Sequence, residues 1–102
     1  MIYVCSPYRG DVAENIAFAK RCCLEVIRAG EVPFAPHIYF TQFLNDNIPQ
    51  ERELGITCGL EVLSLCNEIW FFGDKITDGM LAEIDYAKQH GIDIVYMAQT
   101  LP

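Results

Sequence analysis

MIYVCSPYRGD, residues 1–11, contains three structural signals in a short stretch. Residues 1–6 form a short continuous apolar run, which is typical of a strand buried in a parallel sheet. Residues 7–11 include a proline and a glycine, and they end that run. Asp11 can cap a helix, and Glu14, three residues later, completes a capping-box pattern. This order of strand, loop and helix predicts the first unit of a parallel α/β sheet.

The rest of the chain continues to alternate strands with helices. Apolar residues after Asp11 keep the helical period until Gly30 ends the helix. The later elements are expected at 32–36 (short strand), 37–46 (about two helical turns), 49–66 (helix), 68–73 (strand), 79–90 (helix) and 92–97 (strand). This alternation predicts an α/β fold with a parallel sheet of about four strands and helices on both faces. We expect residues 1–102 to form a single domain.

The helix expected at 49–66 is apolar on two sides, so we expect a neighbour to cover each side. One side carries Leu54, Cys58, Val62 and Leu65, and the other carries Ile56, Leu60 and Leu63. Gly55 and Gly59 are four residues apart, which permits close approach of another backbone at a cost in helix propensity. We interpret this pair as a tight contact, with a contact between subunits as the suspected form. The alternative is a pair of glycines near a frayed helix start.

The composition limits the classes of partner. The chain has 102 residues, of which 52% are hydrophobic and only 21% are charged, more apolar than a small monomer requires. We therefore expect a homo-oligomer, a dimer or larger. The net charge of −7 argues against binding to nucleic-acid phosphates. A single phosphate held by one arginine and backbone amides is compatible with this charge.

The cysteines and the hydropathy pattern indicate a reduced, cytoplasmic protein. Five cysteines are odd in number and form no CxxC pair, so we interpret them as small core residues, with a reactive thiol as the alternative. No signal peptide or membrane-spanning stretch is recognisable, so no membrane partner is expected. His37 and His90 lack a second ligand at helical spacing, so no metal is expected.

Three loops are expected at the carboxyl ends of the strands, where parallel sheets bind ligands: SPYRGD, APH and GDKITDG. In the first loop, the free amides of the following helix favour an anion. Arg9 adds a guanidinium and Ser6 a hydroxyl, which suits one phosphate or another acidic ligand. The alternative is a turn in which Arg9 pairs with a surface carboxylate.

Glu83 lies in the stretch TDGMLAE, which begins the helix at 79–90. Met80, Ile84 and Ala87 share the face that this helix should bury, and Glu83 falls at its edge. A carboxylate there can reach the loop ends and act as a nucleophile, a general base or a ribose ligand. The alternative is an ordinary glutamate at the solvated edge of a helix.

Several other polar residues near the loops allow more than one interpretation. His37 follows the second loop and either faces the ligand or caps the short helix. Asp74 and Asp78 flank the third loop, where either can bind a sugar hydroxyl or simply cap and solvate the chain. Glu51 and Arg52 are interpreted as a helix-start acid and its neighbour, outside the site.

Several motifs together resemble the small nucleoside 2-deoxyribosyltransferase-like proteins. These motifs are IYVCSPYRGD, PFAPHIYFTQFLND with PQERELGI, CNEIWFFG and DGMLAEIDYA, and the resemblance covers nearly the whole chain. It is nearest to the short, mostly uncharacterised bacterial and phage branch. The resemblance implies a flavodoxin-like or Rossmann-like sheet and a site shared within an oligomer.

The resemblance also implies an activity, because enzymes of this family cleave the N-glycosidic bond of 2′-deoxynucleosides or their 5′-monophosphates. Glu83 matches the glutamate that attacks the anomeric carbon, and Tyr3 resembles an aromatic residue that supports it. Ser6 and Arg9 resemble the residues that hold a 5′-phosphate. One position departs from the pattern, since Leu60 falls where these enzymes carry an aspartate. Glu61 is the substitute if the helix is turned slightly.

The candidate site therefore has catalytic and binding residues. The catalytic pair is Glu83 and Tyr3, and the binding residues are Ser6, Pro7, Tyr8, Arg9, Gly10, His37, Asp78, Gly79 and Met80. The expected function is a nucleotide or nucleoside N-glycosidic bond hydrolase or deoxyribosyltransferase with no cofactor. The alternatives are a non-catalytic protein that binds a nucleotide or an ADP-ribose-like ligand, and a plain interaction domain.

Overall fold

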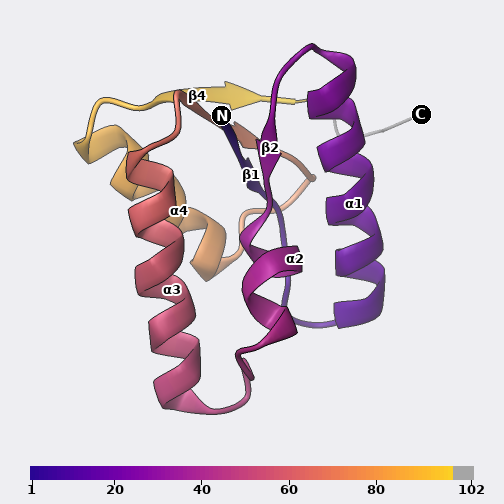
Figure 1. Cartoon of the computed structure of the whole chain (residues 1–102), viewed down its shortest axis with the longest axis vertical. Coiled ribbons are helices and arrows are strands. Elements are labelled where there is room, and N and C mark those ends of the chain that lie inside the picture. Colours follow the sequence, from indigo (N-terminus) through magenta and orange to yellow (C-terminus); the bar gives the residue numbers. More distant parts are fainter. Residues whose placement is uncertain (98–102) are drawn as a thin grey trace.

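A computed structural model describes residues 1–97 of the chain. Its strands and helices alternate along the chain, with a short 3-10 turn after the second helix (Figure 1). The strands are β1 (Ile2–Cys5), β2 (Pro33–Phe34), β3 (Glu68–Phe71) and β4 (Asp93–Tyr96). The helices are α1 (Val12–Arg28), α2 (Pro36–Tyr39), the 3-10 turn η1 (Phe40–Gln42), α3 (Pro49–Ser64) and α4 (Asp78–Gln89). Each element lies within a few residues of its predicted position.

The four strands form one sheet in the order β2-β1-β3-β4, and every neighbouring pair is parallel. β1 and β3 pair along their whole length, with Tyr3 opposite Ile69 and Cys5 opposite Phe71. The chain passes from β1 outward to β2 and then returns to β3 on the other side of β1. This change of direction places a crevice beside the carboxyl end of β1, the usual ligand position in such sheets.

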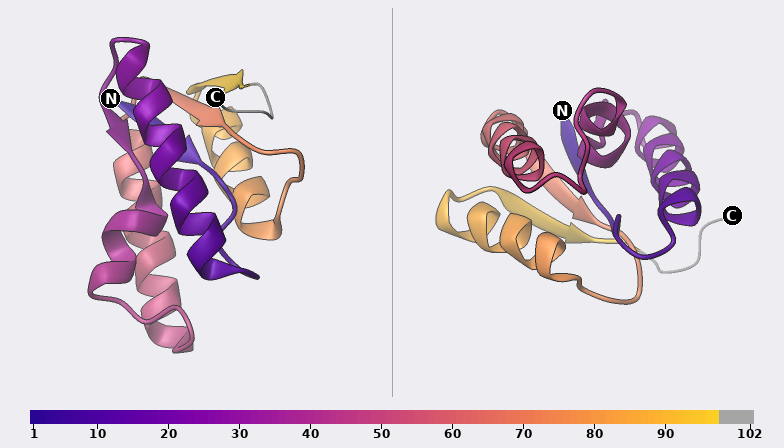
Figure 2. Two further views of the ribbon diagram at one scale, coloured as in Figure 1. Left: turned by 90° about the vertical axis from the view of Figure 1, so that its right-hand side faces the viewer. Right: turned by 90° about the horizontal axis from the view of Figure 1, so that it is seen from below.

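The two faces of the sheet carry different helices. Ile2 and Val4 of β1 pack in a core cluster with residues of α1, whereas Tyr3 and Cys5 pack in a cluster with residues of α3 and α4. The view from below shows α1 on one side of the sheet and α3 with α4 on the other (Figure 2). Successive side chains of a strand point to opposite faces, so the four-residue β1 contributes to both clusters. The predicted α/β fold is confirmed.

Local sequence signals account for the limits of α1. The Asp11 side chain accepts a hydrogen bond from the Glu14 backbone N–H at 3.1 Å, which satisfies one of the free amides of the first turn. After the helix ends, Gly30 adopts a φ of 84°, in the left-handed region that glycine tolerates best. The predicted cap and stop of this helix are confirmed.

Within the described residues, α3 is covered on one side only, and cover of its second side stays a prediction. Only Gly59 and Leu63 of this helix are buried. The side that carries Leu54 and Leu65 faces solvent, with Leu65 76% exposed. One helix packs one stripe against the sheet, and nothing else in the part of the chain that the structure describes covers the second stripe.

The close approach at the two glycines lies within the chain, so the suspected contact between subunits at this pair is not the explanation. A Cβ atom at Gly59 would lie 3.1 Å from the hydroxyl of Tyr3, and one at Gly55 would lie 3.6 Å from Cδ1 of Leu44. Gly59 therefore makes room for the Tyr3 side chain under α3.

The cysteines divide by burial. All five are free, and Cys5, Cys22 and Cys66 are buried as predicted. Cys23 is half-buried, and Cys58 is exposed, which corrects the core interpretation for that residue. Cys58 lies on the uncovered side of α3.

Among residues 1–97, none of the helices combines the length and the apolar character needed to span a bilayer.

Candidate functional site

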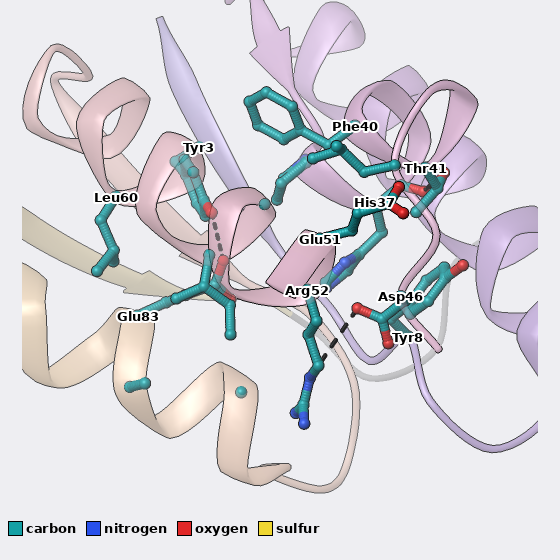
Figure 3. A pocket seen from close by; sticks show the side chains of 17 residues that line it. Tyr3, Tyr8, His37, Phe40, Thr41, Asp46, Glu51, Arg52, Leu60 and Glu83 are labelled. Carbon is teal, nitrogen blue, oxygen red and sulfur yellow. Dashed lines mark hydrogen bonds and ion pairs between the residues drawn. The ribbon is translucent and has the colours of Figure 1, made fainter. Parts of the chain in front are cut away.

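A cavity of about 120 Å³ lies beside the carboxyl end of β1, on the α3 and α4 side of the sheet (Figure 3). Its walls come from β1, the loop after β1, α2 with η1, the loop before α3, α3 itself and the first turns of α4. Most of the lining is apolar, including Phe40, Leu44, Ile56 and Leu60. A wider, open hollow of about 870 Å³ adjoins it and shares several lining residues, among them Tyr8 and Asp46.

Glu83 reaches this cavity from α4. Met80, Ile84 and Ala87 are buried as predicted, and Glu83 beside them is partly buried and lines the cavity. Thr77 caps this helix by accepting a hydrogen bond from the Met80 backbone N–H at 3.2 Å. The cap fixes where the helix begins, so Glu83 is presented to the cavity rather than to open water.

Two side chains of β1 donate hydrogen bonds to the Glu83 carboxylate. The hydroxyl of Tyr3 donates to Oε2, and the thiol of Cys5 lies 3.5 Å from Oε1. Tyr3 and Cys5 are two residues apart on a strand, so both point to the α4 side. Each carboxylate oxygen therefore has its own donor, and the carboxylate is held in one orientation.

Burial controls the ionisation of these groups. It raises the pKa of Glu83 from its ordinary value of 4.5 to about 7, while the hydrogen bonds from Tyr3 and Cys5 act in the opposite direction. Burial and the nearby Glu83 charge raise the pKa of Tyr3 well above 10 and also raise the pKa of Cys5. Tyr3 and Cys5 thus keep their protons and remain donors near neutral pH, whereas Glu83 is close to half-ionised.

An aromatic pair forms another wall of the cavity. The rings of Tyr8 and His37 stack with centroids 4.9 Å apart and an interplanar angle of 24°. Burial lowers the pKa of His37, although the backbone of Ser6 and the charge of Asp46 oppose this. The imidazole is therefore mostly neutral at pH 7. His37 lies, as predicted, near the carboxyl end of β1, where it lines the cavity.

Asp46 links two arginines at the mouth of the cavity. Its Oδ2 lies 3.0 Å from Nε of Arg9, and its Oδ1 lies 4.0 Å from Nε of Arg52. Arg9 also donates from Nη2 to the Asp46 carbonyl at 3.3 Å. Arg9 therefore pairs with a carboxylate, which is the alternative interpretation of the first loop. The Arg9 side chain is more than half exposed.

Tyr8 lines the cavity, whereas the other residues predicted from the first loop do not. Gly10 has a φ of 102° and lines the open hollow together with Arg9. Pro7 is half-buried. Ser6 is fully buried, and within residues 1–97 no partner lies within hydrogen-bond distance of its Oγ.

The third loop contributes less than its sequence indicated. Gly79 lines the cavity, but Asp74 and Asp78 are exposed and do not. Met80 is buried in the core beneath the site, with its carbonyl near Cys5. The first turns of α4, rather than the loop before it, approach the carboxyl end of β1, since Cys5 lies near the Met80 carbonyl and the Glu83 carboxylate.

Four residues of α3 and the preceding loop need correction. Glu51 and Arg52, which the sequence predicts outside the site, both line the cavity. Glu51 also accepts a hydrogen bond from the Asn45 backbone N–H at 2.9 Å, so it is the helix-start acid as well. Asp46 also lines the cavity and is not among the predicted site residues, although it lies in a polar turn between two helices, shortly before a proline, and this pattern is a usable signal. Leu60 lines the cavity, whereas Glu61 is exposed and cannot take its place.

The family model described as Domain of unknown function (DUF7768) matches residues 1–97. The chain belongs to this family. A comparison with curated proteins finds no match. Among solved structures, the chain is similar to a 2-deoxyribosyltransferase from the psychrotolerant bacterium Bacillus psychrosaccharolyticus, with 18% identity and a TM-score of 0.75. The match covers 93% of this chain and 69% of that chain, and it shows that the DUF7768 chain has the fold of a nucleoside deoxyribosyltransferase.

Proposed function

We propose that this protein cleaves or transfers at the N-glycosidic bond of a nucleoside or nucleotide, with Glu83 as the nucleophile. The observation that supports this most is the Glu83 carboxylate, held by Tyr3 and Cys5 at the wall of an apolar cavity. A carboxylate of this kind is shielded from bulk water and oriented toward whatever enters. Its pKa of about 7 keeps a large ionised fraction available at neutral pH.

The size of the cavity suits a sugar better than a whole nucleoside. Its volume of about 120 Å³ is close to that of cavities that admit a six-membered ring, about 150 Å³. The base or a phosphate would then extend into the adjoining hollow beside Tyr8 and Arg9. The anomeric carbon of a sugar in the cavity would face Glu83.

The chemistry has two steps. The Glu83 carboxylate attacks the anomeric carbon, the bond to the base breaks, and a glycosyl ester forms. Water then displaces the carboxylate in a hydrolase, and a second base does so in a transferase. Dividing one difficult displacement into two easier ones is the contribution of such a nucleophile.

Glu83→Gln tests this proposal. Glutamine has nearly the same size and can still accept a hydrogen bond from Tyr3, so folding and ligand binding should survive. Release of base should fall at least about 1,000-fold, because only positioning effects remain without the nucleophile. Base release is measured by chromatography, and binding of nucleosides and their monophosphates is measured by thermal shift. Full turnover in Glu83→Gln would show that Glu83 is only a helix-edge residue.

A non-catalytic binding protein is the second candidate, and Leu60 is the observation that favours it. Leu60 places a side chain with no proton to donate on the cavity wall, at the position where the resembling enzymes carry an aspartate. Tight binding of a nucleotide or an ADP-ribose-like ligand by the wild type, with no base released from any substrate, would establish this candidate.

A further inference from the structure

The charges around the cavity are mostly negative. Asp46, Glu51 and Glu83 line it with carboxylates, and Arg52 is the one guanidinium among its lining residues within 1–97. Arg52 is itself the distant partner of Asp46, at 4.0 Å. With Glu83 ionised, the lining side chains carry a net charge of −2, and the Arg9 guanidinium, 3.0 Å from Asp46 at the mouth, reduces this to −1. The remaining negative charge favours a cation over an anionic group.

The cavity also lacks a group suited to protonating a leaving base. The hydroxyl of Tyr3 is already donated to Glu83, and burial keeps His37 mostly neutral. Asp46 is paired with arginine, and Glu51 accepts a hydrogen bond from a backbone N–H. Leu60 adds none, and apart from the Arg52 guanidinium the remaining lining residues within the described chain are apolar or, like Thr41, carry weakly acidic hydroxyls. A neutral base that needs a proton in order to leave would find no strong acid here.

We propose that the substrate is an N-glycoside whose base carries a positive charge, such as a pyridinium or an N7-alkylated purine. This inference rests on the proposed function of Glu83. Such a base departs as a neutral molecule, so it needs no acid, and its charge is matched by the carboxylates of the cavity.

The reaction needs no reactant besides water. Oε1 or Oε2 of Glu83 forms a bond to the anomeric carbon while the bond from that carbon to the ring nitrogen breaks. The electron pair stays on the nitrogen and neutralises the ring. Water then attacks the anomeric carbon and regenerates the carboxylate, and its proton passes to the neutral imidazole of His37, which lines the same cavity, and on to solvent.

Two further features suit a cationic ring. The stacked faces of Tyr8 and His37 offer an aromatic surface at the cavity wall, and a cation near such a face is attracted by the ring quadrupole. A positive charge beside Glu83 also favours its ionised form, so binding of the substrate would itself activate the nucleophile.

The test compares guanosine with 7-methylguanosine, which differ by one methyl group and one positive charge. The same pair is measured as 2′-deoxynucleosides, and spontaneous release in buffer is subtracted. The expected kcat/KM is at least about 100-fold higher for the methylated member, since general acid assistance typically contributes 100-fold or more where it exists. Nicotinamide riboside, a pyridinium, should also be cleaved, and Glu83→Gln should abolish every one of these reactions.

Asp46→Asn probes the charge at the mouth, with Asp85→Asn as its matched control. Asp85 is exposed on α4, does not line the cavity and gives the same change in net charge. Asp46→Asn should lower the preference for 7-methylguanosine about five- to tenfold, and the control should leave it unchanged. An equal fall in both variants would overturn a local role for the Asp46 carboxylate.

The outcomes separate this inference from the proposed function. Cleavage of guanosine as fast as, or faster than, 7-methylguanosine would overturn the cationic substrate and leave the nucleophile intact. Failure to cleave either member, or nicotinamide riboside, would overturn both. Cleavage confined to the cationic members supports both.

Discussion

At the scale of single residues, Glu83 shows how a helix-edge carboxylate becomes a candidate nucleophile. A glutamate at this edge of a helix can extend into solvent, but hydrogen bonds from Tyr3 and Cys5 hold the Glu83 carboxylate at the cavity wall. Their hydrogen bonds favour the ionised form, and burial opposes it more strongly, so the pKa rises to about 7. The group is thus kept near the point where a small change in its surroundings, such as a bound cation, decides its charge.

The raised pKa of Glu83 predicts a pH-dependent loss of stability. The folded state binds this proton more tightly than the unfolded state, so the contribution is fully present below about pH 4.5 and is lost as pH rises through about 7. At pH 8 the penalty is up to about 3 kcal/mol, since one pKa unit corresponds to about 1.4 kcal/mol.

Urea unfolding of wild type and Glu83→Gln between pH 5 and pH 8 measures this effect. The free energy of unfolding of the wild type, relative to Glu83→Gln, should decrease as pH rises. His37, whose lowered pKa destabilises the folded state at acid pH, is present in both proteins and cancels in the difference. A constant difference across this range would contradict the raised pKa of Glu83.

At the scale of elements, α3 serves the site by leaving space. Gly59 is buried where the Tyr3 hydroxyl must pass to reach Glu83, and any Cβ there would be 3.1 Å from that hydroxyl. Tyr3 is itself buried and hydrogen-bonded, so it has little freedom to move away. The weakness of a glycine in a helix interior is the physical cost of this arrangement.

Gly59→Ala and Gly55→Ala form a matched pair on this helix. Gly55→Ala places its Cβ 3.6 Å from Leu44, an ordinary contact, so it should stabilise the protein by about 0.5–1 kcal/mol through helix propensity. Gly59→Ala should lose that gain and reduce turnover, because it displaces Tyr3 from Glu83.

Thermal unfolding and base release measure the two effects. Equal stabilisation by both alanines, with turnover unchanged, would show that the approach of Tyr3 to Gly59 is not restrictive.

At the scale of the whole molecule, the sheet order brings distant segments together. Because β3 pairs with β1 on the side opposite β2, α3 and α4 share one face, and α1 covers the other (Figure 2). The cavity therefore collects residues from the first strand, the middle loops and the last helix. The same arrangement leaves the Leu54 and Leu65 side of α3 in solvent.

That exposed side predicts self-association into a dimer or larger. Leu54 is 55% exposed and Leu65 is 76% exposed on one helix, in a chain with 52% hydrophobic residues. Light scattering at micromolar concentration should report more than one chain per particle. Leu65→Lys should reduce the assembly, whereas Leu24→Lys on α1, which is 46% exposed, should not. A monomeric wild type would contradict the prediction.

Local sequence patterns are sufficient to predict the helices and strands, because the signals for each element lie within a few residues of one another. The apolar run at 1–6, the cap at Asp11 and the stop at Gly30 were read correctly, and so was the buried face of α4 beside Glu83. The position of Glu83 at the edge of that face was also predictable from the helical period. Its role as a nucleophile stays a prediction.

Which side chains meet depends on the packing of the whole chain. The contact between Tyr3 and Glu83 joins residues 80 positions apart, and the pairing of Arg9 with Asp46 joins residues 37 apart. Helical and strand periods say which face a residue occupies, but not which segment lies opposite that face. That depends on the strand order and on the packing of helices, so the tight contact at Gly59, the exposure of Leu65 and the carboxylates at the cavity mouth became known only from the fold.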